Sequence, residues 1–133
     1  MSTSPSMIRL VKQNGYHRDC GVACLATLFG VTYDESLVAC SHVAPDVLEL
    51  GMTWAQIRRA AERLGADTKM LPRGRYDIED ATGLLNVKSR AVEHVVFLWA
   101  GRVLEGNGEL WLDPDDYFRQ YKVRPYSLLV RAE

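Results

Sequence analysis

Cys20 is the residue whose type and position are best suited to chemistry. It stands in the run Asp19-Cys20-Gly21, and a strongly apolar pattern typical of a buried helix begins at this point. The N-terminus of a helix carries partial positive charge, which stabilises a thiolate. Because the thiolate is the nucleophile in cysteine acyl-transfer chemistry, the sequence predicts a nucleophile in the first turn of a helix.

A nucleophilic cysteine needs a base and a site for the oxyanion, and the chain has candidates for both. His94 precedes a nearly continuous apolar run that ends at Trp99. We therefore expect His94 at the mouth of a strand, where it can accept a proton and later return it. Gln13 lies a short loop before Cys20, so its side-chain N–H can donate to the developing oxyanion. The backbone N–H of Cys20, at the start of the helix, is the second donor.

Three residues compete for the role of orienting the ring of His94. If the chain turns tightly after the apolar run, Glu105 and Asn107 point to the same face as His94, because side chains alternate along a strand. Asp113 is the third candidate, although its Leu-Asp-Pro context is more typical of a helix N-cap. We rank Glu105 first and Asn107 second.

These motifs resemble those of the papain-like cysteine peptidases, and most closely those of the C39-type bacteriocin-processing peptidases and their stand-alone relatives. In that group a Gln precedes an Asp/Glu-Cys-Gly motif that opens the central helix, and a His starts a strand of the sheet. The resemblance spans about residues 7–130 and is carried by Gln13, Asp19-Cys20-Gly21 and His94-Val95-Val96. It implies a triad of Cys20, His94 and a third residue, for which Glu105, Asn107 and Asp113 are the candidates, with Gln13 as oxyanion donor; Asn14 is the alternative donor.

The function implied by this resemblance is hydrolysis of a peptide amide bond by a thiol peptidase without a cofactor or metal. The partner would be a peptide or protein substrate, such as a leader peptide or a small protein. Deamidation and transglutamination use the same triad, so they remain alternatives. A C39-like module that only binds a substrate segment is the non-enzymatic alternative.

A structural zinc site is a competing interpretation of the same cysteines. Soft or borderline ligands gather in one third of the chain, namely His17, Cys20, Cys24, Cys40 and His42. Their spacing matches no common zinc module. We therefore expect Cys24 and Cys40 to be buried free thiols.

Local patterns predict helices mainly in the first half and strands mainly in the second. We expect helices at 20–29, 32–39, 54–64 and 114–121, with capping residues Asp19, Thr32, Thr53 and Asp113. We expect strands at 7–11, 68–71, 94–99, 102–105 and 126–131, whereas 76–87 is ambiguous. This order predicts an α+β domain with the papain-like arrangement, in which a Cys-bearing central helix packs on a C-terminal antiparallel sheet.

Length and composition favour one ordinary globular domain. The 133 residues suit a single domain spanning 1–133, with 1–6 as a flexible tail. A net charge of -1 with both signs scattered predicts no nucleic-acid partner. Neither a secretory signal nor a membrane span is visible in the sequence, and three cysteines do not suggest a disulfide framework. We expect a cytoplasmic monomer.

Overall fold

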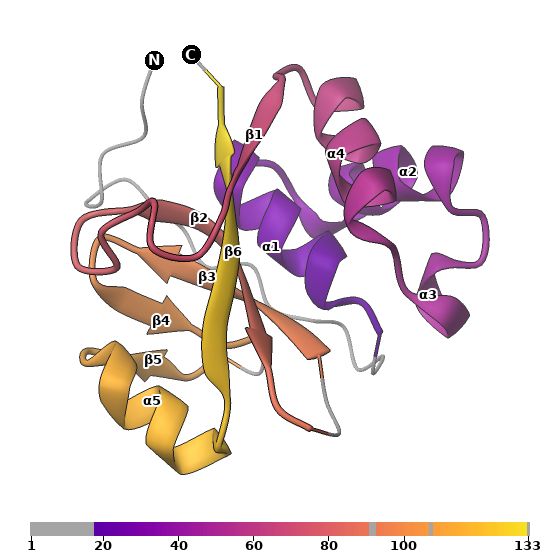
Figure 1. The fold of residues 1–133 in the computed structure, drawn as a ribbon. Helices are drawn as coiled ribbons and strands as arrows, with labels where there is room; N and C mark the ends of the chain where they lie inside the picture. The colour runs from indigo at the N-terminus through magenta and orange to yellow at the C-terminus, as the bar shows by residue number, and fades with distance from the viewer. Residues whose placement is uncertain (1–17, 91–92, 107, 133) are drawn as a thin grey trace.

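The computed structural model describes residues 18–90, 93–106 and 108–132. The elements follow in the order α1 (Cys20–Phe29), α2 (Tyr33–Val43), α3 (Val47–Leu50), α4 (Trp54–Arg63), β1 (Thr68–Leu71), β2 (Thr82–Lys88), β3 (Glu93–Trp99), β4 (Arg102–Leu104), β5 (Leu110–Trp111), α5 (Pro114–Tyr121) and β6 (Arg124–Arg131). The strands form one antiparallel sheet in the order β1-β6-β2-β3-β4-β5 (Figure 1). The α+β class is confirmed. The strand expected at 7–11 and the tail expected at 1–6 lie outside the described residues.

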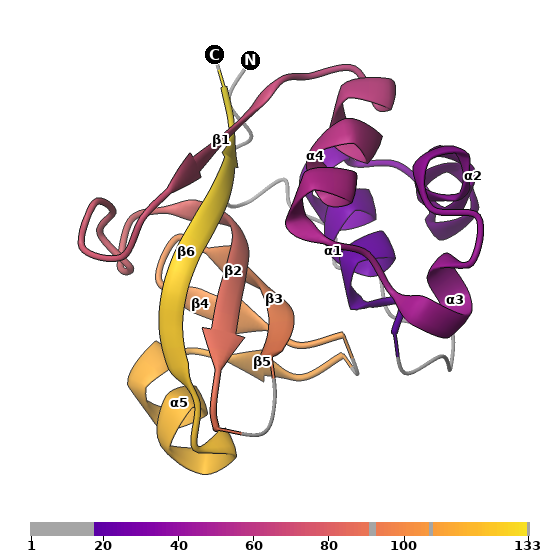
Figure 2. The same cartoon turned by 45° about the vertical axis from the view of Figure 1, so that its right-hand side comes forward.

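The sheet separates two hydrophobic cores. Helices α1 to α4 lie on one side of it and α5 lies on the other (Figure 2). Because consecutive strand residues point to opposite faces, Val95 and Phe97 of β3 pack toward α1 while Val96 and Leu98 pack on the side of α5. The nearly continuous apolar run from Val95 to Trp99 thus belongs to a central strand that is covered on both faces.

The two predicted capping boxes start α2 and α4. The hydroxyl of Thr32 accepts from the N–H of Glu35, and the hydroxyl of Thr53 accepts from the N–H of Gln56. Helix α2 continues to Val43, beyond the expected end near residue 39, because no residue stops it before Pro45. Helix α4 ends one residue earlier than expected.

Helix α1 has the predicted bounds, but the predicted role of Asp19 as its side-chain cap is wrong. Gly30 ends the helix in the left-handed conformation with φ 67°. Asp19 occupies the N-cap position with φ -99° and ψ 17°, outside the extended region that a capping side chain needs. Its carboxylate is fully buried and instead accepts a hydrogen bond of 2.6 Å from the hydroxyl of Tyr33.

The strands of the second half follow the prediction with small shifts. The ambiguous segment 76–87 contains the start of β2, and β6 begins two residues earlier than expected. The tight turn at Ala100-Gly101 is confirmed, with φ of 45° and 84°, and it pairs Leu98 with Val103. The sequence did not reveal α3 or β5, because elements of four and two residues are too short to show a period.

None of the helices in the described ranges is long and apolar enough to cross a membrane alone. Helices α1 and α2 reach the necessary length and composition only when joined, and the chain bends by 120° between them.

Candidate active site

A cleft of about 700 Å³ separates the first turn of α1 and the start of α4 from the start of β3. Its lining residues are Arg18, Cys20, Gly21, Leu50, Gly51, Met52, Thr53, Trp54, Ile57, Glu93, His94 and Val95. A Cβ on Gly21 would meet the methyl carbon of Met52 at 3.0 Å, so glycine lets Met52 approach the helix beside the cysteine. Helix α1 and strand β3 begin at the same end of the molecule (Figures 1 and 2). Two residues far apart in the sequence, Cys20 and His94, therefore line one cleft.

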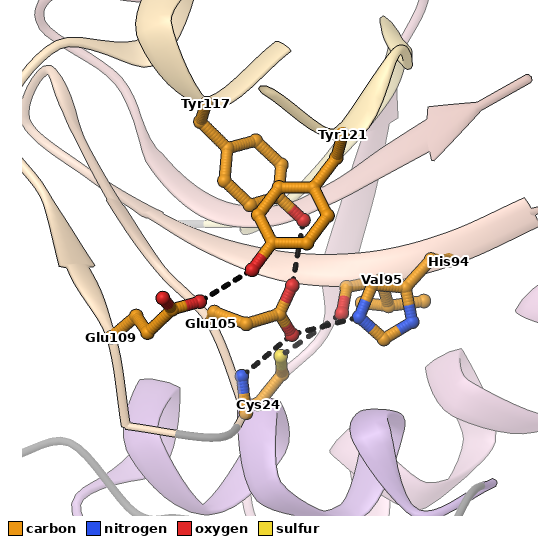
Figure 3. Close-up of polar contacts among 8 residues, drawn as sticks. Cys24, His94, Val95, Glu105, Glu109, Tyr117 and Tyr121 are labelled. Atoms are coloured by element: carbon orange, nitrogen blue, oxygen red, sulfur yellow. Dashed lines mark hydrogen bonds and ion pairs between the residues drawn. The ribbon is translucent and has the colours of Figure 1, made fainter. Parts of the chain in front are cut away.

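The ring of His94 lies between a thiol and a carboxylate. Its side chain hydrogen-bonds to that of Cys20. Nε2 of the ring lies 2.8 Å from Oε1 of Glu105 (Figure 3). Cys20 is partly exposed in the cleft, whereas Glu105 is buried. The order thiol, imidazole, carboxylate is the one that general-base activation of a nucleophile requires.

The carboxylate of Glu105 is held at both oxygens. Besides His94, Oε1 accepts a hydrogen bond of 2.8 Å from the N–H of Gly106, and Oε2 accepts one of 2.6 Å from the hydroxyl of Tyr117 on α5. Figure 3 shows the carboxylate between the ring of His94 and the hydroxyl of Tyr117. Burial favours the neutral acid, but the hydrogen bonds from His94, Tyr117 and Gly106 outweigh it and lower the pKa of Glu105. Glu105 is therefore an ionised acceptor at neutral pH.

The two neighbours of His94 favour its protonated form. Burial opposes a charged ring, yet the hydrogen bonds to Cys20 and Glu105, and their negative charges, raise the pKa of His94 to about 10. At neutral pH the site therefore favours an imidazolium between the sulfur of Cys20 and the carboxylate of Glu105. Such a pair makes the sulfur the nucleophile and leaves the ring ready to protonate a leaving group.

The other two cysteines have a different environment. The thiol of Cys24, one turn after Cys20, points toward the backbone carbonyl of Val95 at 3.9 Å (Figure 3). Burial, with the charges of Cys20, Glu105 and Asp19, raises the pKa of Cys24 well above its usual value. Burial also raises the pKa of Cys40 to about 11. Both remain protonated thiols at neutral pH.

The zinc ligands considered from the sequence do not come together in the described part of the chain. No group of three or more His, Cys, Asp or Glu side chains there could hold a metal ion. The thiol of Cys40 lies 3.9 Å from the hydroxyl of Ser36, while that of Cys24 faces β3. His17 lies outside the described residues, and His42 is in the last turn of α2.

The remaining sequence candidates have different outcomes. Gln13, Asn14 and Asn107 lie outside the described residues. Asp113 caps α5 by accepting from the N–H of Asp115 at 2.9 Å, in agreement with its N-cap interpretation. Glu105 thus holds the position behind His94.

Sequence reasoning missed the two tyrosines that hold buried carboxylates, Tyr33 and Tyr117. A buried tyrosine hydroxyl needs a hydrogen-bond partner. A tyrosine in the helix expected at 114–121 was therefore the available sign that Tyr117 would bind a buried polar group. Its partner could not be chosen without the tertiary structure.

Comparison with known proteins adds no relative. No protein-family model matches the sequence, and no curated protein matches it. The functional argument therefore depends on the geometry of the cleft.

Proposed function

We propose that this protein is a papain-like thiol hydrolase that cleaves an amide bond of a peptide or small protein. The observation that carries the proposal is that Cys20 and His94 line one open cleft while the buried carboxylate of Glu105 hydrogen-bonds to the ring of His94. A cysteine kept only for packing does not require a protonated imidazole beside it or a buried carboxylate behind that ring. The partial exposure of Cys20 gives a substrate access to the sulfur.

In the proposed reaction the thiolate of Cys20 attacks the carbonyl carbon and forms a carbon–sulfur bond. The backbone N–H of Cys20, at the start of α1, donates to the oxyanion, and Gln13 is the expected second donor. His94 gives its proton to the amine as the carbon–nitrogen bond breaks, which leaves an acyl-enzyme and a neutral ring. The ring then takes a proton from water, whose oxygen displaces the sulfur and releases the acid.

The papain-like fold is part of the same proposal. It is supported by a cysteine at the start of a helix that packs on an antiparallel sheet, and by a histidine at the start of a central strand of that sheet. The same constellation can deamidate or transfer an acyl group when ammonia leaves or an amine replaces water. The products formed from a cleaved peptide or from glutamine distinguish these reactions.

Alkylation with iodoacetamide near neutral pH tests the nucleophile without a known substrate. We expect Cys20 to be labelled about tenfold or more faster than Cys24 and Cys40, because Cys20 lines an open cleft beside His94 whereas the other two are buried thiols with raised pKa values. Peptide mapping of the labelled protein measures each rate. Equal rates at Cys20 and Cys24 would contradict the proposal.

Turnover can then be measured with p-nitrophenyl acetate, a small reactive ester. We expect a burst of nitrophenol as Cys20 is acylated, followed by slower release of acetate. Cys20→Ala should abolish the burst, whereas Cys24→Ala, its control one helical turn away, should keep it. A burst that survives in Cys20→Ala would place the nucleophile elsewhere.

A further inference from the structure

Four basic side chains gather beside the cleft, where β2 ends and β6 begins. They line a pocket of about 490 Å³ with Ser89 and Tyr126, and we refer to it as the basic pocket: Lys88, Ser89, Arg90, Lys122, Arg124 and Tyr126. None of the described residues that line it is acidic. Because the whole chain has a net charge of -1, this concentration of positive charge is local.

Most of this charge forms no ion pair with another residue in the part of the chain that the structure describes. Lys88 forms an ion pair of 3.9 Å with Glu93. Within residues 18–90, 93–106 and 108–132, no ion pair engages Arg90, Lys122 or Arg124, and all three side chains are exposed. Clustered cations of this kind attract an anionic partner.

The basic pocket adjoins the cleft through the strand register. Lys88 of β2 pairs with Glu93 on β3 and with Arg124 on β6, and the preceding residue of β2, Val87, pairs with His94. Glu93, the partner of Lys88, itself lines the cleft. Neighbouring strands are about 5 Å apart and successive residues about 3.3 Å, so the backbone of Lys88 lies roughly 6 Å from that of His94. An extended peptide bound at Cys20 would reach the basic pocket within about two to five residues.

We propose that the basic pocket binds an acidic segment of the peptide substrate, a few residues away from the amide that Cys20 attacks. This inference depends on the proposed function, because it assigns the class of substrate for the same cleft. The side chains of Arg90, Lys122 and Arg124 would pair with Asp or Glu carboxylates, which fixes the register of the peptide and speeds its capture.

A nucleic acid fits the basic pocket less well than an acidic peptide. Proteins that bind single strands stack bases on aromatic rings, and Tyr126 is the one ring among the lining residues that the structure describes. That ring already carries Lys88 at 5.0 Å and Arg73 at 5.5 Å from its centre. Point charges without a stacking surface suit carboxylates better than bases.

Direct binding to the Cys20→Ala protein tests the acidic-peptide inference separately from catalysis. The probe is a fluorescein-labelled, Gly/Ser-based peptide of about 12 residues carrying four Glu, and its counterpart has four Gln; both are followed by anisotropy at about 50 mM NaCl. We expect the Glu peptide to bind and the Gln peptide to bind at least about fivefold more weakly, with the difference shrinking at about 0.3 M salt. Equal binding of the two peptides, no binding of the Glu peptide, or tighter binding of a single-stranded oligothymidylate would overturn the inference.

A matched pair of double variants locates the contact. The double variant Arg90→Gln with Arg124→Gln should bind the Glu peptide about fivefold or more weakly than the unsubstituted pocket does. Arg59→Gln with Lys69→Gln, which removes the same charge from exposed positions on α4 and β1, should leave binding within about twofold. An equal loss in both pairs would indicate a general charge effect and overturn the assignment.

The same double variants distinguish this inference from the proposed function. The ester burst of the Cys20-containing protein should be unchanged in both, because a neutral ester does not touch the basic pocket. When Arg90 and Arg124 are both present, a normal burst combined with no binding of the Glu peptide refutes the acidic-peptide inference alone, while an absent burst refutes the proposed function.

Discussion

The cleft has a helical wall, to which α1 and α4 contribute, and a sheet wall, to which β3 contributes. Next to a lining residue of each wall lies a buried carboxylate that is held by a tyrosine. On the helical wall, Asp19 precedes Cys20 and accepts from Tyr33, the first residue of α2. On the sheet wall, Glu105 follows β4 and accepts from Tyr117 of α5. Both hydrogen bonds are 2.6 Å long.

The difference between the two pairs is what else the carboxylate contacts. Glu105 also binds the ring of His94, so its charge contributes directly to the protonation of that ring. The Asp19–Tyr33 pair joins the start of α1 to the start of α2, and so positions the helix that carries Cys20. Similar tyrosine–carboxylate pairs can therefore have different roles. The Glu105–Tyr117 pair sets the charge beside His94, whereas the Asp19–Tyr33 pair holds two helices together.

The largest expected effect is the loss of the charge on Glu105. Glu105→Gln keeps the shape of the side chain but removes the anion behind His94, so acylation by p-nitrophenyl acetate should fall roughly 10²- to 10⁴-fold. Glu109→Gln is the control, because Glu109 accepts from Tyr121 of the same helix α5 at 2.5 Å. Equal rates in the two variants would show that the charge on Glu105 is not used.

The pH dependence of the sheet wall should follow His94. Its pKa of about 10 lies above the usual 6.5, so the burst should persist through neutral pH and decline as the pH rises toward 10. The folded pKa is raised, so the stabilisation from this proton is complete below pH 6.5 and is lost as the pH rises through about 10. NMR titration of the ring measures the pKa directly, and Glu105→Gln should lower it. A ring that titrates near 6.5 in the unsubstituted protein would contradict the proposed ion pair.

Tyr117→Phe should have a smaller effect, detectable through the pH profile. It leaves Oε2 of Glu105 buried without its donor, which should cost about 1–3 kcal/mol in the free energy of unfolding. Because this hydrogen bond helps to lower the pKa of Glu105, the acid limb of the acylation profile should move to higher pH. Urea unfolding and the pH–rate curve test the two parts separately. An unmoved acid limb would reduce Tyr117 to a packing role.

Tyr33→Phe should produce the smallest effect on chemistry. Removing its hydroxyl weakens the Asp19 pair and should cost about 1–2 kcal/mol in the free energy of unfolding. The pKa of His94 and the acid limb of acylation should stay where they are, since Asp19 lies on the other wall. A shift equal to that of Tyr117→Phe would remove the distinction between the walls.

Much of the helical wall could be predicted from sequence because its signals are local. The capping boxes at Thr32 and Thr53 and the left-handed Gly30 each depend on residues within one turn. The exception is Asp19, whose carboxylate turns to Tyr33, fourteen residues away. A local capping rule cannot anticipate a competing partner on another helix.

On the sheet wall, the sequence predicted only those features that follow from the alternation of side chains along a strand. The turn at Ala100-Gly101 and the period of two placed Glu105 on the face of His94, and the register agrees. The role of Tyr117 could not be predicted from the sequence, because its contact with Glu105 depends on how α5 packs on the sheet. The basic pocket could not be predicted for a similar reason, since Lys88 and Arg124 become neighbours only through the pairing of β2 with β6.

The position of β6 has a consequence for how the chain folds during synthesis. This last strand lies between β1 and β2, and its Leu128 and Leu129 belong to the two different cores. Until residues 124–131 emerge from the ribosome, β1 has no neighbour in the sheet and β2 has only β3. Non-local pairing of this kind closes late. The nascent chain therefore carries both Cys20 and His94 well before it has the completed sheet that supports them, so the proposed nucleophile and base can be held together only after β6 has been synthesised.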